Sequence, residues 1–144
     1  MIIAAAIAMV AIVAGSIALN MINRGRREVQ RTMAREQAAH RELNALAEAL
    51  DRFKADVQRY PTNEEGLRCL ARKPAAFEAD GRSSYWYGPY IESVPEVDPW
   101  GSDYVYHTVD EGRSFELYSP GPGGEMGSDS RFRVTSQPSA PVDR

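Results

Sequence analysis

The sequence predicts an α+β protein in which one long N-terminal helix packs against a short helix and a small antiparallel β-sheet. Three features predict this fold class. The first 23 residues contain no charged side chain, apolar residues then recur at three- and four-residue steps as far as Val57, and two alternating segments flank a turn at residues 110–112. A chain of 144 residues suits one small domain.

The composition restricts the chemistry that we expect of the chain. Its one cysteine excludes an intramolecular disulfide and a multi-cysteine metal site. The two histidines, His40 and His107, are far apart in the sequence, so a histidine-based metal cluster is not expected. Because these residue types assemble neither a nucleophile–base pair nor a metal triad, we expect a protein that is not an enzyme.

Residues 1–23 are predicted to form a single transmembrane helix. A span needs about 20 apolar residues, and Arg24, Arg26 and Arg27 follow the apolar run directly. A buried soluble helix and a cleaved secretory signal are the alternatives, but such a signal usually has a basic start and an apolar run of about 7–15 residues. The positive-inside rule, taken alone, would place the C-terminal body in the cytoplasm.

Charge is distributed unevenly along the rest of the chain. Residues 24–42 carry six arginines and three glutamates, whereas residues 43–144 carry a net charge of about −6. The basic stretch adjoins the apolar segment, so we expect it to contact the phosphate groups of membrane lipid. The acidic body argues against nucleic-acid binding.

Residues 24–59 are predicted to continue the helix with one apolar face. No proline or glycine interrupts residues 26–59, and the apolar character strengthens toward the C-terminal end. His40 falls on this face, where a packing role is favoured over a catalytic or metal-binding one. The helix should end at Tyr60-Pro61, because the residue before a proline disfavours the helical conformation.

Residues 60–129 are predicted to form a globular head. Thr62 and Glu65 have the spacing of a capping box, which predicts a short helix that ends at Lys73-Pro74. Cys69 lies beside the inner face of this helix, and we interpret it as a buried, inert thiol. The following stretch, as far as Gly88, is expected to be a loop.

Aromatic residues are concentrated between residues 85 and 106, which hold seven of the 13 aromatic side chains. We favour their use in the core of a small head over a stacking surface for bases or sugars. Asp98-Pro99-Trp100-Gly101 predicts a turn, and residues 103–108 and 114–119 predict an antiparallel hairpin that packs on the long helix. Residues 130–144 are predicted to form a flexible tail.

Four segments resemble the major pseudopilins of bacterial type II secretion systems, which belong to the type IV pilin-like superfamily. They are RYPTNEEGL at residues 59–67, KP at 73–74, GPYIESVPEVDPWGSDYVY at 88–106 and FELYSPGPGGEMG at 115–127. The resemblance covers about residues 43–129. It implies a type IV pilin-like α+β fold with a long N-terminal helix, a short helix and a small antiparallel sheet.

The resemblance also implies a function. Members of this family are structural, non-enzymatic subunits of a pseudopilus, a helical filament that acts in type II protein secretion. The implied partners are further copies of the chain, other pseudopilins, inner-membrane secretion components and membrane lipid, and no nucleic acid. The implied location is the inner membrane, crossed once, with the C-terminal body in the periplasm.

The start of the long helix departs from the family pattern. The family's helix carries a glutamate that, counted back from Tyr60, falls near Ala8, which is uncharged. The alternative interpretation is therefore an uncleaved, membrane-tethered pseudopilin-like binding or adaptor protein that does not polymerise. The family's basic leader holds the N-terminus in the cytoplasm, and such a leader upstream of Met1 would reconcile the arginines after the span with a periplasmic body.

The resemblance implies a calcium site in the loop after the last predicted strand. A Gly-Ala-Asp-Gly segment supplies a carboxylate in the family, whereas the aspartate position is Gly123 here. Calcium takes about six to eight oxygen ligands. The expected ligands are Pro120, through its backbone carbonyl, with Glu125, Ser128 and Asp129; solvation of the loop without calcium is the alternative.

Overall fold

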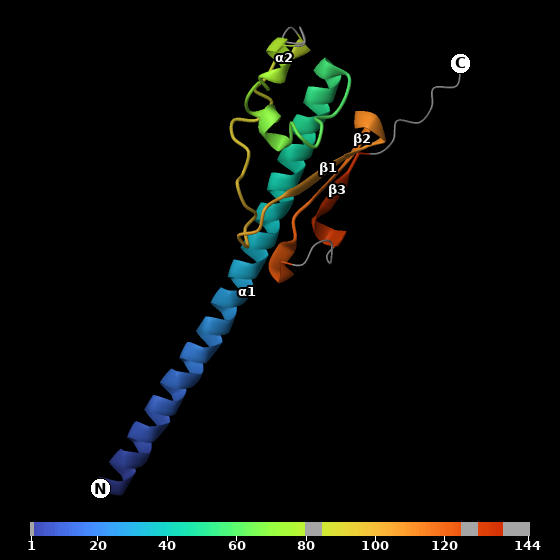
Figure 1. The fold of residues 1–144 in the computed structure, drawn as a ribbon. Helices are drawn as coiled ribbons and strands as arrows, with labels where there is room; N and C mark the ends of the chain where they lie inside the picture. Colours follow the sequence, from blue (N-terminus) through green and yellow to red (C-terminus); the bar gives the residue numbers. More distant parts are fainter. Residues whose placement is uncertain (1, 80–84, 125–129, 137–144) are drawn as a thin grey trace. The chain divides into compact units, whose positions relative to one another are not determined.

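The computed structural model describes residues 2–79, 85–124 and 130–136. It consists of two compact units, Met1–Glu36 and Gln37–Arg144, and each is described by itself. Helix α1 (Ile2–Val57) contributes to both units, and the three-stranded sheet belongs to the second (Figure 1).

The first unit is the N-terminal part of α1. It contains no proline and is rich in alanine, the strongest helix former. The side chains of residues 24–35 are exposed, and Arg31 lies 3.9 Å from Glu28. No helix among the residues that the structure describes is both long and apolar enough to cross a membrane.

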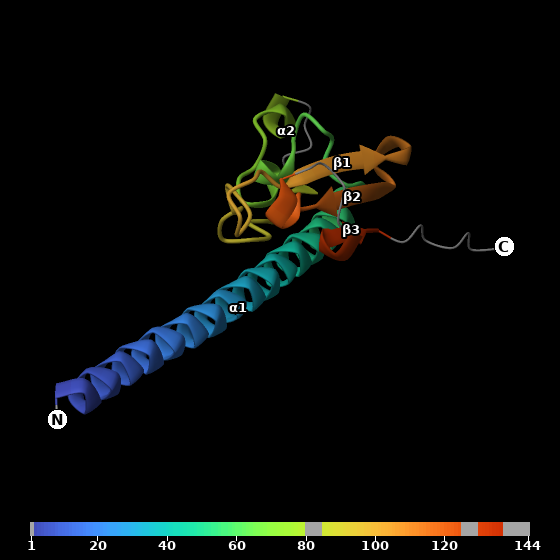
Figure 2. The same cartoon turned by 90° about the horizontal axis from the view of Figure 1, so that it is seen from below.

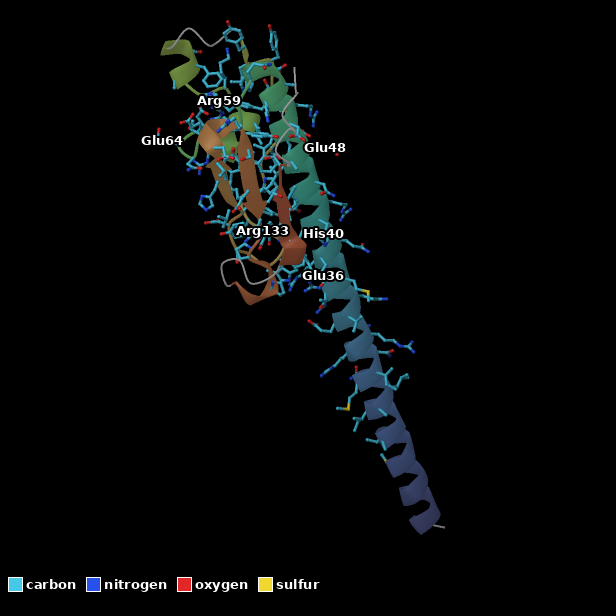
Figure 3. All side chains as sticks on the ribbon, turned by 90° about the vertical axis from the view of Figure 1, so that its right-hand side faces the viewer. Glu36, His40, Glu48, Arg59, Glu64 and Arg133 are labelled. Atoms are coloured by element: carbon cyan, nitrogen blue, oxygen red, sulfur yellow. The ribbon has the colours of Figure 1, made fainter. Side chains whose placement is uncertain are left out.

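The second unit is built on the last turns of α1, where one helix face is buried. The buried side chains recur at three- and four-residue steps and are at most 1% exposed: Ala39, Leu43, Leu46, Leu50 and Phe53. Glu48 points away from the strands on the opposite face (Figure 3). The helix ends at Val57, two residues earlier than predicted, because Gln58 leaves the helical conformation with a φ of 65°.

The sheet packs on the buried face of α1. Strand β1 (Val105–Val109) pairs antiparallel with β2 (Ser114–Tyr118), with Val105 opposite Tyr118, and β2 pairs antiparallel with β3 (Arg133–Thr135). Figures 1 and 2 show the three strands beside the C-terminal part of α1. Phe115 and Leu117 of β2 share one hydrophobic core with the helix. The predicted hairpin and the α+β fold class are therefore confirmed.

Strand β3 lies where a flexible tail was predicted, so that prediction was wrong for residues 130–135. A 3-10 helix, η5 (Ser130–Phe132), precedes the strand, and Phe132 is fully buried. The Phe132 ring lies 5.0 Å from the Trp100 ring and 5.2 Å from the His40 ring, measured between centroids. One aromatic anchor therefore orders the segment, and the His40 ring packs against it as predicted, although His40 as a whole is exposed. The rest of the predicted tail, residues 137–144, lies outside the described residues.

The short helices of the head also differ from the prediction. After the capping box the chain forms a 3-10 helix, η1 (Leu67–Leu70), instead of an α-helix, because Gly66 just before it has a φ of 58°, outside the helical region. A one-turn helix, α2 (Ala76–Ala79), forms where a loop was predicted. Two further 3-10 turns follow β1 and β2: η3 (Asp110–Gly112) and η4 (Gly121–Gly123).

Candidate functional site

The candidate site begins at the joint where α1 ends and the head begins. The Arg59 guanidinium donates two parallel hydrogen bonds of 2.7 Å to the Glu65 carboxylate and a third to the backbone carbonyl of Tyr60. The two charged side chains are only 21% and 11% exposed. The hydrogen bonds to Glu65 raise the pKa of Arg59. Such a two-pronged pair fixes both distance and orientation.

Glu65 also closes the turn that follows the joint. The Thr62 backbone N–H donates to Glu65 Oε2 at 2.8 Å, and the Glu65 N–H donates to Thr62 Oγ1 at 3.2 Å. This reciprocal pair is the predicted capping box, although the turn that it caps does not continue as an α-helix. One carboxylate therefore holds both Arg59, just after the end of α1, and the first turn of the head.

The joint is bonded to the hairpin turn as well. The Tyr60 N–H donates to the Gly112 carbonyl at 2.8 Å. A Cβ atom at Gly112 would lie 3.2 Å from Cβ of Arg59, and the Gly112 backbone has a φ of 86°. Glycine at this turn therefore permits the close approach that the hydrogen bond needs.

Two more hydrogen bonds extend the joint along β1. The Tyr106 hydroxyl donates to the Pro61 carbonyl at 2.7 Å, and the Thr108 N–H donates to Asn63 Oδ1 at 2.8 Å. We refer to residues 59–65 as the bracket, because this stretch connects the end of α1 to the hairpin. The RYPTNEEGL sequence thus has a structural role that its capping pattern only partly indicated.

Three carboxylates of α1 accept hydrogen bonds from tyrosines of the head. The pairs are Tyr60 with Asp51 at 2.7 Å, Tyr90 with Asp56 at 2.9 Å, and Tyr104 with Glu42. Burial raises the pKa of Tyr60 and of Tyr90 to about 12 and also raises that of Tyr104. The phenols therefore remain proton donors at neutral pH. Sequence reasoning missed these pairs, although the acidic residues beside the apolar face were a usable signal.

A second polar cluster links the predicted turn at residues 98–101 to the end of β2. Asp98 is 3% exposed, and its Oδ1 accepts the backbone N–H groups of Trp100 and Ser102. Its Oδ2 accepts the Ser119 hydroxyl, whose oxygen in turn accepts the Gly121 N–H at 3.0 Å. The sequence predicted the turn but not this buried connection to the loop after β2.

The predicted calcium ligands fall largely outside the described residues. Pro120 is buried, whereas Glu125, Ser128 and Asp129 are not described. Asp98 is close in the fold, but both of its oxygens already accept hydrogen bonds from the protein. Within the described ranges, no group of three His, Cys, Asp or Glu residues is placed to hold a metal ion. The calcium site stays a prediction.

Cys69 has the inert character expected of it. The side chain is 2% exposed, and its sulfur lies 3.1 Å from the Gly66 carbonyl oxygen. Burial raises the pKa of the thiol to about 12, so the reactive thiolate is strongly disfavoured. Trp86 donates its indole N–H to the Cys69 carbonyl at 3.0 Å, which ties the aromatic segment to η1.

The aromatic segment serves the core at most of its positions. Five of its seven side chains belong to the hydrophobic core or pack against it: Trp86, Tyr90, Trp100, Tyr104 and Tyr106. Tyr85 and Tyr87 differ, since they are 56% and 75% exposed. The core interpretation therefore holds for five residues and leaves two tyrosines at the surface.

An open depression of about 340 Å³ lies beside α1 within the second unit. Its lining combines small or apolar side chains with one charge of each sign: Ala38, Ala45, Ile91, Pro95, Arg41 and Glu42. The hydrogen bond from Tyr104 holds Glu42 in place. This hollow suits side chains of another macromolecule better than an enclosed small ligand.

The last turns of the long helix α1 carry a three-stranded antiparallel sheet, and the bracket joins the two. A long helix with such a sheet defines the pilin-like class of α+β proteins. The sequence matches the family described as "Type II secretion system (T2SS), protein G" over residues 28–136. The chain belongs to this family, whose members are the major pseudopilins.

Individual relatives agree with the family match. The chain is 41% identical over 96 residues to the type II secretion system core protein G of Aeromonas hydrophila and 38% identical over 96 residues to that of Escherichia coli K12. Each alignment covers 67% of this chain and 65% or 64% of the relative, so the chain spans just under two thirds of their length.

A solved structure supports the fold. The crystal structure of the major pseudopilin from the type 2 secretion system of enterohaemorrhagic Escherichia coli is 30% identical in sequence and has a TM-score of 0.50. The match covers 78% of this chain and 90% of that one. The type IV pilin-like fold expected from the sequence is therefore confirmed.

Proposed function

We propose that the chain is the repeating structural subunit of a pseudopilus-like filament in type II protein secretion. The observation that carries this proposal is the bracket, which fixes the head on one face of α1. The opposite face, which carries the exposed Glu48, remains open to neighbours (Figure 3). Asn44 is also exposed and stands four residues before Glu48, on the same side of the helix. The family match and the names of the relatives support the same role.

Cross-linking between copies tests the filament directly. Cysteines replace Asn44 and Glu48 together, both exposed on α1, so that each copy has two reactive thiols and can be linked to two neighbours, while the buried Cys69 stays unreactive. A filament predicts a ladder of dimers, trimers and larger species in cells that contain the other secretion components. Failure of the double-cysteine variant to give species larger than a dimer would contradict the proposal.

The second candidate is a membrane-tethered adaptor that does not polymerise. The exposed Tyr85 and Tyr87 favour it, since exposed aromatic residues often mark binding surfaces. Replacing both tyrosines with serine separates the two functions. An adaptor would lose its partner, whereas a filament subunit would still give the cross-linked ladder.

The proposal includes a location in the inner membrane, with residues 1–23 in lipid and the C-terminal body in the periplasm. Its support is the run of 23 uncharged residues followed by arginines. A reporter that is active only in the periplasm, joined after Arg144, tests the orientation. Reporter activity in the periplasm is expected, and a purely cytoplasmic signal would contradict this part of the proposal.

The proposed partners are other pseudopilins, inner-membrane secretion components and lipid, without nucleic acid. The role requires no catalysis, because assembly exchanges lipid contacts of the helix for contacts between helices. The raised pKa of Cys69 is in keeping with a non-enzymatic role.

A calcium site formed by Pro120, Glu125, Ser128 and Asp129 is a further part of the proposal. Its support is two carboxylates in one short loop, whose start is anchored through Ser119 to Asp98. When bound, calcium would cross-link the loop through oxygen ligands. Titration calorimetry with calcium should give binding that Asp129→Asn abolishes, while Asp103→Asn, a change at an exposed acid, leaves it intact. No heat of binding with the unaltered chain would contradict the site.

A further inference from the structure

We propose that neighbouring copies associate through opposite charges, with an arginine stripe on α1 of one copy lying on an acidic loop of the next. The arginine stripe consists of Arg24, Arg27, Arg31 and Arg35, and the acidic loop consists of residues 91–97 with Glu92 and Glu96. This inference rests on the proposed filament function, because it names the surfaces through which the subunits meet.

The arginine stripe follows from helical spacing. Its members stand at positions i, i+3, i+7 and i+11, which places them within an arc of roughly 80° along about 16 Å of helix. All four are exposed. Glu28 lies 3.9 Å from Arg31, but both side chains are 72% exposed, so this pair neutralises the stripe weakly. The stripe therefore presents a line of positive charge to other molecules.

The acidic loop lies over α1 beside the depression. Ile91 and Pro95 line the hollow together with small residues of the helix, and the neighbouring Glu92 and Glu96 are exposed. Neither glutamate has an ion pair with another residue that the structure describes. The loop thus combines an apolar floor with negative charges that lack a described partner on their own chain.

An arginine side chain fits both parts of this surface. Its methylene stem packs on apolar surface while its guanidinium pairs with carboxylates. Ile91 and Pro95 offer the apolar surface, and Glu92 and Glu96 the carboxylates. The depression of about 340 Å³ leaves space for such side chains to enter.

A second copy accounts for more of these features than a lipid surface does. Anionic lipid would neutralise the arginine stripe but would leave the acidic loop and the depression without a partner. Each copy carries both halves of the pair, so head-to-tail contacts can repeat from copy to copy along a filament, in keeping with the proposed function. Each contact pairs the basic part of one copy, within residues 24–42, with the acidic part of the next copy, within residues 43–144.

Charge reversal in the full chain tests the pairing. Arg27→Glu with Arg31→Glu, or Glu92→Arg with Glu96→Arg, should each raise the protein concentration needed for assembly by about tenfold, since two exposed ion pairs become repulsive. Mixing the two double variants should recover assembly, because their reversed surfaces complement each other. Raising the salt concentration should weaken assembly of the unaltered chain.

Matched controls distinguish this inference from the filament function itself. Glu78→Arg with Asp103→Arg reverses two exposed acids outside the acidic loop and the bracket and should leave assembly unchanged. If the unaltered chain does not assemble, the proposed function fails. If it assembles and the Glu92/Glu96 variant assembles equally well, the inference alone is overturned.

Cross-linking of cysteine variants tests the same contact even where the charge-reversal variants fail to fold. A cysteine at Arg27 in one copy and a cysteine at Glu96 in another should cross-link when both are present, whereas Arg27→Cys with Glu64→Cys should not. Loss of anionic-vesicle binding by the Arg27/Arg31 variant, with no effect of either double variant on assembly, would assign the arginine stripe to lipid and overturn the inference.

Discussion

Glu65 shows how much of the joint depends on one side chain. Its carboxylate accepts hydrogen bonds from the Arg59 side chain and from the Thr62 backbone, so two oxygen atoms hold the stretch from residue 59 to residue 65 together. Hydrogen bonds to charged groups contribute about 1.5–3 kcal/mol each when buried. The position of the head on the helix is thus sensitive to this one residue.

Replacing Glu65 with alanine should lower the free energy of unfolding by about 2 kcal/mol, because it leaves the mostly covered Arg59 guanidinium without its carboxylate partner. Glu64→Ala is the matched control, since Glu64 is exposed and adjacent, and it should change stability by less than about 0.5 kcal/mol. Denaturant unfolding followed by the fluorescence of Trp86 and Trp100 measures both. Equal effects of the two changes would show that the bracket does not stabilise the head.

Tyr60 makes the stability of the head depend on pH in the alkaline range. Burial raises its pKa from 10 to about 12, so the folded state keeps the phenol proton over a range in which the unfolded chain releases it. The free energy of unfolding should therefore fall as pH rises from about 10 to 12. Tyr60→Phe should make that decline shallower, as measured by thermal unfolding at each pH. An unchanged decline would assign the alkaline loss to other groups.

At the scale of elements, β3 is the part that depends most on tertiary packing. It is only three residues long, and its position is fixed by pairing with β2 and by the buried Phe132 just before it. The Ser119 N–H donates to the Phe132 carbonyl at 3.0 Å, which joins this segment to the end of β2. Because the Ser119 hydroxyl also donates to Asp98, Ser119 connects the segment before β3 to the buried Asp98.

Phe132→Ala should destabilise the head by about 3–5 kcal/mol, the usual cost of truncating a buried phenylalanine. Amide hydrogen exchange at Ser119 should become faster at the same time, because the anchor of its acceptor is lost. Thr135→Ala is the control, since Thr135 is exposed in the same strand and its replacement should change stability little. Slow exchange at Ser119 in the Phe132 variant would show that β3 holds without this anchor.

The same elements show what the sequence predicted and where it failed. Strict three- and four-residue spacing and the alternation around residues 110–112 predicted α1 and the hairpin, because a covered face leaves a regular pattern. β3 is too short to leave such a pattern, and its order comes from the contacts of Phe132 with Trp100 and His40. Segment η1 is a 3-10 helix instead of an α-helix because the Gly66 backbone has a φ of 58°, and no pattern of side chains encodes that φ value.

The candidate site was predictable only in part. The capping box and the turn at residues 98–101 were found because each is a local pattern of side chains with a fixed spacing. The links from Tyr90 to Asp56 and from Ser119 to Asp98 join residues 34 and 21 positions apart, and they depend on how the chain packs. Long-range polar pairs of this kind follow from the fold and not from local sequence.

At the scale of the whole molecule, the hydrophobic core that stabilises the fold and the arginine stripe belong to different units. Among the side chains that the structure describes, the hydrophobic core begins at Ala39, and none of its members lies in the first unit. Arg24, Arg27, Arg31 and Arg35 all lie within those 36 residues. Stability of the head and association of copies should therefore be separable by truncation.

A fragment that starts at Gln37 should fold cooperatively and melt at nearly the same temperature as the full chain, because it keeps the whole core. A fragment that starts at Ala47 loses Leu43 and Leu46 and should not fold, since each buried leucine contributes about 2–5 kcal/mol to a total of about 5–15 kcal/mol for a domain. Circular dichroism and thermal unfolding measure both. The first fragment, which lacks the arginine stripe, should also fail to form assemblies by itself. A folded fragment that still assembles would place the contacts between copies elsewhere on the head.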